Sequence, residues 1–99
     1  HALILPKNHY KNVCDLDDTV AAKVLPLAAK IGTAMKEGLG CSGFNLVQNN
    51  GTDAGQTVFH FHVHVIPRYQ GGPSIAAWEP HAANEKELAE TAEKIRTLL

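Results

Sequence analysis

The sequence predicts a small α+β domain built on an antiparallel sheet. Two segments, one following Asp18 and one following Asn84, carry apolar residues at helical spacing, and three short apolar runs are typical of strands. These elements do not alternate as they do in βαβ units, which favours antiparallel pairing. With 99 residues, of which 44% are hydrophobic and 19% charged, we expect a single domain over residues 1–99.

The N-terminal half is expected to contain a strand followed by a helix. Residues 2–7 form an apolar run that is typical of a short strand. Asp17 and Asp18 stand where a helix N-cap belongs, and Pro26 is expected to kink the following helix or to mark a restart. Gly38 and Gly40 are expected to end this helix. Its predicted apolar face consists of Val20, Val24, Leu27, Ala28, Ile31 and Met35.

The C-terminal half is expected to contain two further strands and a second helix. Residues 44–47 are the first of these strand candidates, and residues 49–55 form a loop rich in residues that tolerate positive φ. Residues 58–66 form the strongest strand of the chain. Asn84 followed by Glu87 matches a capping box ahead of a final amphipathic helix.

Charge and cysteine content exclude several classes of protein. Nine basic and ten acidic residues give a net charge of −1, so no basic surface for nucleic acid is expected. Every apolar stretch is shorter than the roughly 18 residues that cross a bilayer. Cys14 and Cys41 form no CxxC pair, which fits a reducing compartment. We therefore expect a cytoplasmic protein, and because the chain begins with His1 we interpret it as a piece of a longer one.

Three of the six histidines alternate along the strand predicted over residues 58–66. Strand periodicity places His60, His62 and His64 on one face. The opposite face is expected to carry Phe59, Phe61, Val63 and Val65. The apolar face suits a core, whereas three neighbouring imidazoles require polar partners if they are buried. The histidine face is therefore the candidate site.

Two chemistries remain open for this face. Imidazole is the commonest metal ligand, but His60 and His64 would lie about 13 Å apart, so only a neighbouring pair could share an ion. Alternatively, a neutral imidazole can attack phosphorus, provided that positioned donors stabilise the phosphate oxygens. The candidate donors are the backbone N–H groups of Asn49 and residues 51–57, together with the side chains of Gln56 and Thr57.

Residues 55–68, which read Gly-Gln-Thr-Val-Phe-His-Phe-His-Val-His-Val-Ile-Pro-Arg, resemble the signature of the histidine triad (HIT) family. Residues 1–7 resemble the family's upstream segment of a histidine, a strand and a proline, and residues 49–51 resemble its phosphate- and ribose-contacting loop. The resemblance covers the whole chain. It implies the HIT fold, with an antiparallel sheet and two helices, in a homodimer whose sheets join across the interface.

The resemblance also implies a role for each candidate residue. His62 would be the nucleophile that takes a nucleoside monophosphate, and His64 would contact the phosphate and donate a proton to the leaving group. His60 would orient His62 and line the phosphate side, and His1 would be a fourth histidine behind the triad. The residues implied to bind substrate are Asn49, Gly55, Gln56, Thr57 and His64.

A zinc site is implied only in part. Many bacterial members hold a structural zinc with a CxxC pair and histidines that match His9 and His60. Two histidines do not complete a tetrahedral site, so we expect zinc only in a full-length protein that supplies the cysteines. The chemistry itself is expected to need no cofactor. The family's N-terminal helix and hairpin, which shape the nucleoside pocket, are not among these residues, so base preference is not predicted.

The resemblance implies a nucleotide hydrolase. The ending of residues 66–68 and a C-terminal helix after Trp78 resemble bacterial HIT proteins and the fragile-histidine-triad branch, which cleaves dinucleoside polyphosphates. A second branch cleaves nucleoside phosphoramidates. We expect one of these substrates, with a purine nucleotide that contains AMP, to react through a nucleotidyl intermediate on His62. The alternative is a nucleotide-binding regulator or scaffold with negligible turnover, and a metalloprotein is the third interpretation.

Overall fold

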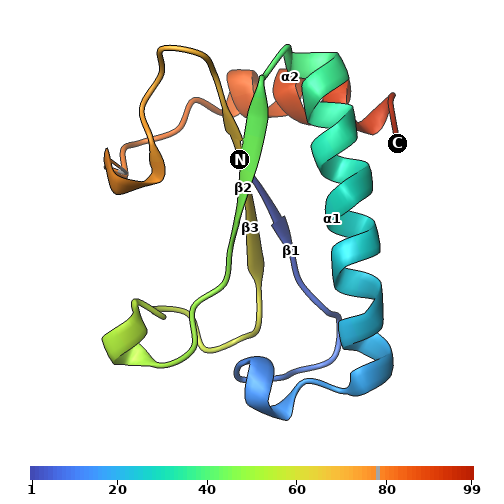
Figure 1. The fold of residues 1–99 in the computed structure, drawn as a ribbon, viewed down its shortest axis with the longest axis vertical. Helices are drawn as coiled ribbons and strands as arrows, with labels where there is room; N and C mark the ends of the chain where they lie inside the picture. Colours follow the sequence, from blue (N-terminus) through green and yellow to red (C-terminus); the bar gives the residue numbers. More distant parts are fainter. Residues whose placement is uncertain (78) are drawn as a thin grey trace.

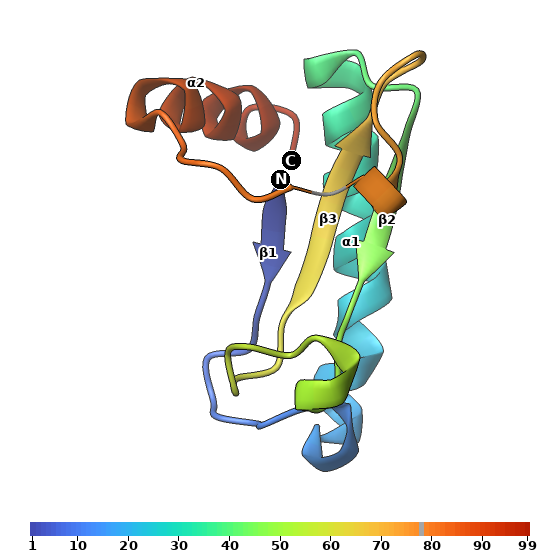
Figure 2. The ribbon, with the colours of Figure 1, turned by 90° about the vertical axis from the view of Figure 1, so that its left-hand side faces the viewer.

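The computed structural model describes residues 1–77 and 79–99 and confirms the α+β class (Figure 1). Its antiparallel sheet has the order β1-β3-β2, and its long helix α1 packs along one face. Helix α2 contacts α1 at one end of the molecule (Figure 2). The elements are β1 (Ala2–Ile4), α1 (Asp18–Leu39), β2 (Gly43–Val47), β3 (Val63–Arg68) and α2 (Glu85–Arg96). Trp78 lies outside the described residues.

Helix α1 begins and ends as its sequence predicts. The carboxylate of Asp17 accepts a hydrogen bond from the amide of Thr19 at 2.9 Å, which satisfies a free N–H of the first turn. Gly40 ends the helix in the left-handed region, with φ of 68°. The expected restart at Pro26 does not occur, and α1 is one helix through this residue. Pro26 is exposed, so water can bond the carbonyl that loses its helical partner.

The core lies between α1 and the sheet. Met35 and Val65 are its largest fully buried side chains. Gly32 lets the helix approach β2 closely, because a Cβ atom at this position would lie 2.2 Å from the ring of Phe44. Ile95 of α2 packs against the same core. In the described ranges, no helix combines the length and apolar character that a bilayer crossing needs.

Strand β3 is displaced along the chain from its predicted position over residues 58–66. It begins at Val63, because the ladder with β1 ends where Val63 faces Ile4 and the ladder with β2 ends where His64 faces Val47. The residues before Val63 have no strand beside them. At its other end β3 continues through Pro67, which is tolerated because β1 no longer pairs there.

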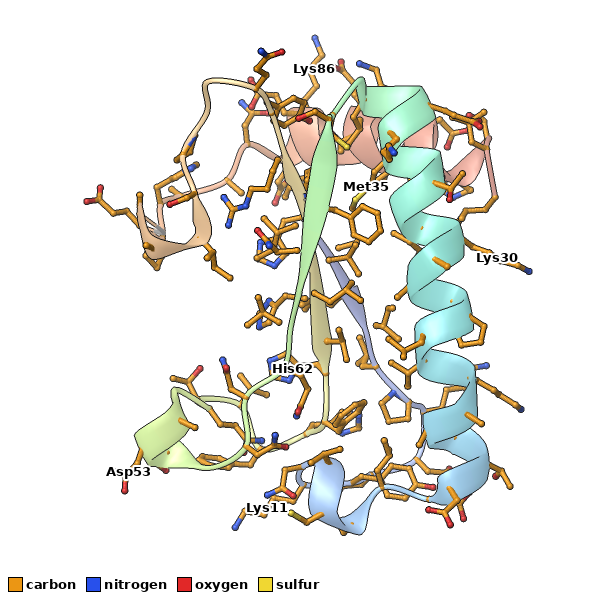
Figure 3. All side chains as sticks on the ribbon, viewed as in Figure 1. Lys11, Lys30, Met35, Asp53, His62 and Lys86 are labelled. Atoms are coloured by element: carbon orange, nitrogen blue, oxygen red, sulfur yellow. The ribbon has the colours of Figure 1, made fainter. Side chains whose placement is uncertain are left out.

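The sheet face opposite to α1 carries the histidines. His64 faces Leu3 of β1 and Val47 of β2, so these side chains share that face. Val63 and Val65 point to the other face and are buried in the core. Figure 3 shows His62 on the side of the sheet away from α1. The predicted separation of histidine and apolar faces is therefore confirmed from residue 61 to residue 65.

Candidate active site

The segment before β3 is held by the turn that follows β1. The amide of Phe61 donates to the carbonyl of Tyr10 at 2.7 Å, and the Phe61 ring is buried in the core. Phe59 was expected on the core face but is 45% exposed, and the ammonium of Lys11 lies 5.7 Å from its ring centroid. The prediction for Phe59 was wrong because strand alternation does not extend to residues outside the ladder.

His62 is oriented by a hydrogen bond within this segment. Its Nδ1 lies 2.7 Å from the backbone carbonyl of His60. A carbonyl only accepts, so Nδ1 carries the proton, and Nε2 of the neutral ring keeps its lone pair. The ring meets that of His64 edge to face, with centroids 5.0 Å apart. This arrangement leaves Nε2 of His62 able to act as a nucleophile, with the imidazole of His64 beside it.

His64 is paired with His1. Nδ1 of His64 lies 2.8 Å from Nε2 of His1, although the two residues are 63 positions apart in the chain. Burial lowers the pKa of His64 below its ordinary value of 6.5, and repulsion from the His62 ring whenever that ring is protonated lowers it further. His64 is therefore neutral at pH 7. The structure thus brings His1, His62 and His64 together, as the resemblance implied.

The ring of His60 is turned toward the turn after β1. Its Nε2 lies 2.9 Å from the carbonyl oxygen of Pro6, and its Nδ1 lies 3.2 Å from Nδ1 of His9. His60 therefore orients His62 through its backbone carbonyl, while its ring nitrogens bond Pro6 and His9. The expectation that His60 lines the phosphate side stays a prediction, with both ring nitrogens already bonded within the protein.

His9 and His60 supply two corners of a metal site but not a complete one. Two nitrogens bound to one zinc ion at about 2.0–2.1 Å in tetrahedral geometry lie about 3.3 Å apart, close to the observed 3.2 Å. Over residues 1–77 and 79–99, however, no cluster of three or more ligating side chains includes this pair. These residues therefore do not fit a structural zinc ion by themselves.

Gln56 holds the loop between β2 and β3 rather than facing a substrate. Its side chain is 2% exposed, and its Oε1 accepts from the amide of Gly51 at 2.8 Å. Its Nε2 donates to the carbonyls of Lys11 at 2.7 Å and Val58 at 3.1 Å. The predicted role of this side chain as a substrate ligand does not agree with its position, because its amide is fully bonded inside the protein.

The backbone N–H groups expected to cradle a phosphate are largely bonded within the loop. Gly55 donates to the carbonyl of Thr52 at 3.0 Å, and both Ala54 and Gln56 donate to that of Gly51. Gly55 instead adopts the left-handed backbone conformation that this turn requires, with φ of 91°. A Cβ atom at this position would lie 3.7 Å from Nδ2 of Asn49.

Two of the predicted substrate ligands, Asn49 and Thr57, differ from Gln56 in having side chains that are not bonded within the described part of the protein. The side chains of Asn49 and Thr57 make no hydrogen bond to the described residues. The backbone of Asn49 is held in place by Gln48, whose side-chain amide donates to the carbonyl of Asn49 at 3.1 Å and to the side chain of Asn50 at 2.7 Å. Of the substrate ligands predicted in this loop, Asn49 and Thr57 are therefore the ones whose side chains can still bond a substrate.

A pocket beside His62 was not predicted. It has a volume of about 150 Å³ and is lined by Leu3, Leu5, Val58, His60 and His62. Leu3 is 51% exposed on the histidine face. The sequence signal for this pocket was the alternation of Leu3 and Leu5 with buried Ile4, because strand periodicity places Leu3 and Leu5 on the face opposite to Ile4. The hydrogen bond from the amide of Phe61 to the carbonyl of Tyr10 was also not predicted, because a backbone hydrogen bond does not depend on residue type.

Comparison with known proteins identifies the family. The sequence model of the HIT domain matches residues 1–71. The chain belongs to the HIT domain family. The HIT chain is 40% identical over 87 residues to protein hit of Bacillus subtilis, an alignment that covers 87% of this chain and 60% of that protein. It thus spans somewhat less than two thirds of the length of that relative.

Two further comparisons place this HIT domain among proteins of similar structure and of named activity. It is 33% identical over 96 residues to adenosine 5'-monophosphoramidase hnt1 of Schizosaccharomyces pombe, covering 96% of this chain and 69% of that protein. A Hit-like protein of Bartonella henselae superimposes with a TM-score of 0.89 at 32% identity, covering 98% of this chain and 69% of that one. Some members of the family are therefore hydrolases that act on nucleotides.

Proposed function

We propose that this HIT domain hydrolyses nucleotides through a covalent intermediate on His62. The hydrogen bond from Nδ1 of His62 to the carbonyl of His60 carries this proposal, because it leaves the lone pair of Nε2 for attack on phosphorus. The similarity to an adenosine monophosphoramidase supports an adenylyl group as the part transferred. The leaving group would be an amine or a nucleoside polyphosphate.

The reaction would proceed in two displacements. First, Nε2 of His62 forms a bond to the α-phosphorus, and the bond to the leaving group breaks, with the leaving atom keeping the electron pair. His64 lies beside His62 and is the candidate to give that atom a proton, which its ring, neutral at pH 7, must first take up from solvent. Second, water attacks the phosphorus and gives a proton to His64, the phosphorus–nitrogen bond breaks with its electron pair returning to Nε2, and AMP leaves with His62 and His64 restored.

One observation favours the alternative of a nucleotide-binding regulator. The N–H groups of Gly51, Ala54, Gly55 and Gln56 are bonded inside the loop, so fewer backbone donors remain to stabilise charge on the phosphate than the loop sequence predicted. Removing a donor from such a site typically lowers turnover by about 10²- to 10³-fold. A protein with this loop would bind nucleotide and hydrolyse it with negligible turnover.

Measuring AMP release by wild type and His62→Ala tests the proposal. Each is incubated with a diadenosine polyphosphate and, separately, with an adenosine phosphoramidate. His81→Ala is the matched control, because His81 is exposed and bonds the carbonyl of Ala82, away from the triad. We expect release by wild type and the control, and none by His62→Ala, which should still bind AMP.

The other outcomes have defined meanings. Equal release by wild type and His62→Ala would refute the covalent mechanism. Binding of AMP by all three proteins with release by none would establish the regulator instead. The faster of the two substrates would identify the leaving group.

A further inference from the structure

The loop after β2 is tied to the segment before α1 through a pair of side-chain amides. Gln48 and Asn50 bond each other twice, with Nδ2 of Asn50 2.6 Å from Oε1 of Gln48 and Nε2 of Gln48 2.7 Å from Oδ1 of Asn50. Oδ1 of Asn50 also accepts from the backbone amide of Val13 at 2.9 Å. Figures 1 and 2 show the two segments at the same end of the molecule. The amide pair therefore fixes the loop against a part of the chain that is 37 residues away.

Two backbone groups determine which way round these side-chain amides lie. The amide of Val13 can only donate, so the atom of Asn50 that it meets is the oxygen. Nδ2 of Asn50 then donates to Oε1 of Gln48, which leaves Nε2 of Gln48 facing the backbone carbonyl of Asn49 at 3.1 Å. That carbonyl can only accept, so both ends of the network require the same arrangement. Gln48 is thus needed as a donor, whereas Oδ1 of Asn50 is needed as an acceptor.

The residue enclosed by this pair is Asn49. Its backbone carbonyl is bonded by Gln48, its two neighbours bond each other across it, and its own side-chain amide makes no hydrogen bond to the described residues. Gly55 bounds the same amide on another side, because a Cβ atom at Gly55 would lie 3.7 Å from Nδ2 of Asn49. Asn49 therefore combines an ordered backbone with an unused polar side chain, so it has little conformational entropy left to lose when it binds a ligand.

We propose that Gln48 is a positioning residue that, together with Asn50, orders the backbone at Asn49 before substrate binds, so that the Asn49 side chain can bond the nucleotide. The inference rests on the proposed function, because that function supplies the nucleotide as the ligand of this loop. Without the amide pair, binding would have to order the backbone at Asn49 as well. The side chain of Gln48 bonds only Asn49 and Asn50 among the described residues, so its loss should weaken ground-state and transition-state binding alike. KM should then rise while kcat is unchanged.

Matched variants separate the donor role of Gln48 from its charge and shape. Gln48→Glu keeps the shape but cannot donate to Asn49 or Asn50. Asn50→Asp brings the same charge into the pair while keeping both bonds that Oδ1 accepts, and Gln48→Ala removes the pair without adding charge. Isothermal titration calorimetry with AMP measures binding without turnover, and AMP release measures kcat and KM. Far-ultraviolet circular dichroism and the urea midpoint check that each variant is folded.

We expect the Kd for AMP and the KM to rise about three- to tenfold in Gln48→Ala and Gln48→Glu, the change expected for one hydrogen bond, with kcat unchanged. Asn50→Asp should raise both constants less than Gln48→Glu does, and His81→Ala is again the control. A double-mutant cycle gives the decisive comparison. In an Asn49→Ala background, Gln48→Ala should cause no further rise in Kd, because Gln48 acts through Asn49.

Additive effects of Gln48→Ala and Asn49→Ala on Kd would overturn the proposal, because Gln48 would then act independently of Asn49. An unchanged Kd in Gln48→Ala would overturn it as well, and a rise in Gln48→Glu alone would then be an effect of charge. If the two residues are coupled while neither wild type nor any variant releases AMP, the positioning of Asn49 stands and the proposed hydrolysis is refuted. If the coupling is absent while wild type releases AMP and His62→Ala does not, this inference fails and the proposed function stands.

Discussion

Replacing Gln56 by Glu should destabilise the loop that carries Asn49 and Thr57. The two side chains have nearly the same shape, but Nε2 of Gln56 donates to the carbonyls of Lys11 and Val58, and a carboxylate cannot donate. A protonated Glu restores only one of these bonds. Losing one bond costs about 1 kcal/mol, and burying an unsatisfied carbonyl adds about 1–3 kcal/mol. The free energy of unfolding should therefore fall by about 2–4 kcal/mol.

Urea unfolding followed by circular dichroism measures this loss, and AMP release measures its effect on the site. Asp53→Asn is the control, since Asp53 is exposed in the same loop. We expect a lower urea midpoint and a higher KM for Gln56→Glu and little change for the control. If Gln56 instead contacts substrate directly, KM will rise while the midpoint stays at the wild-type value, and our account of its buried hydrogen bonds is refuted.

Two other predictions concern packing and pH. Gly32→Ala should lower the free energy of unfolding by about 1–2 kcal/mol, because displacing the Phe44 ring outweighs the gain in helix propensity, and Phe44→Ala should remove this penalty in a double-mutant cycle by urea unfolding. Since the pKa of His64 is lowered on folding, the unfolded chain takes up its proton first, and stability should fall as the pH drops below about 6.5. The urea midpoint of His64→Gln should depend less on pH over this range, and an unchanged slope would contradict the shift.

Local sequence patterns were enough to predict the helix caps and the two faces of the paired part of β3. Asp17 and Asn84 cap the helices as expected, since each cap bonds an amide only two or three residues away. The alternation of His62 and His64 with buried valines followed from strand periodicity. The histidine signature predicted the family, which the HIT domain match confirms.

Tertiary structure alone decided how the histidines are used. The partners of His1 and His9 lie 63 and 51 positions away, and no local pattern specifies which ring nitrogens will meet. The inward direction of Gln56 depends on the carbonyl of Lys11, which belongs to a different turn. The start of β3 depends on where its neighbouring strands end. Periodicity determines which face a side chain occupies, but its hydrogen-bond partner is determined only when distant segments pack together.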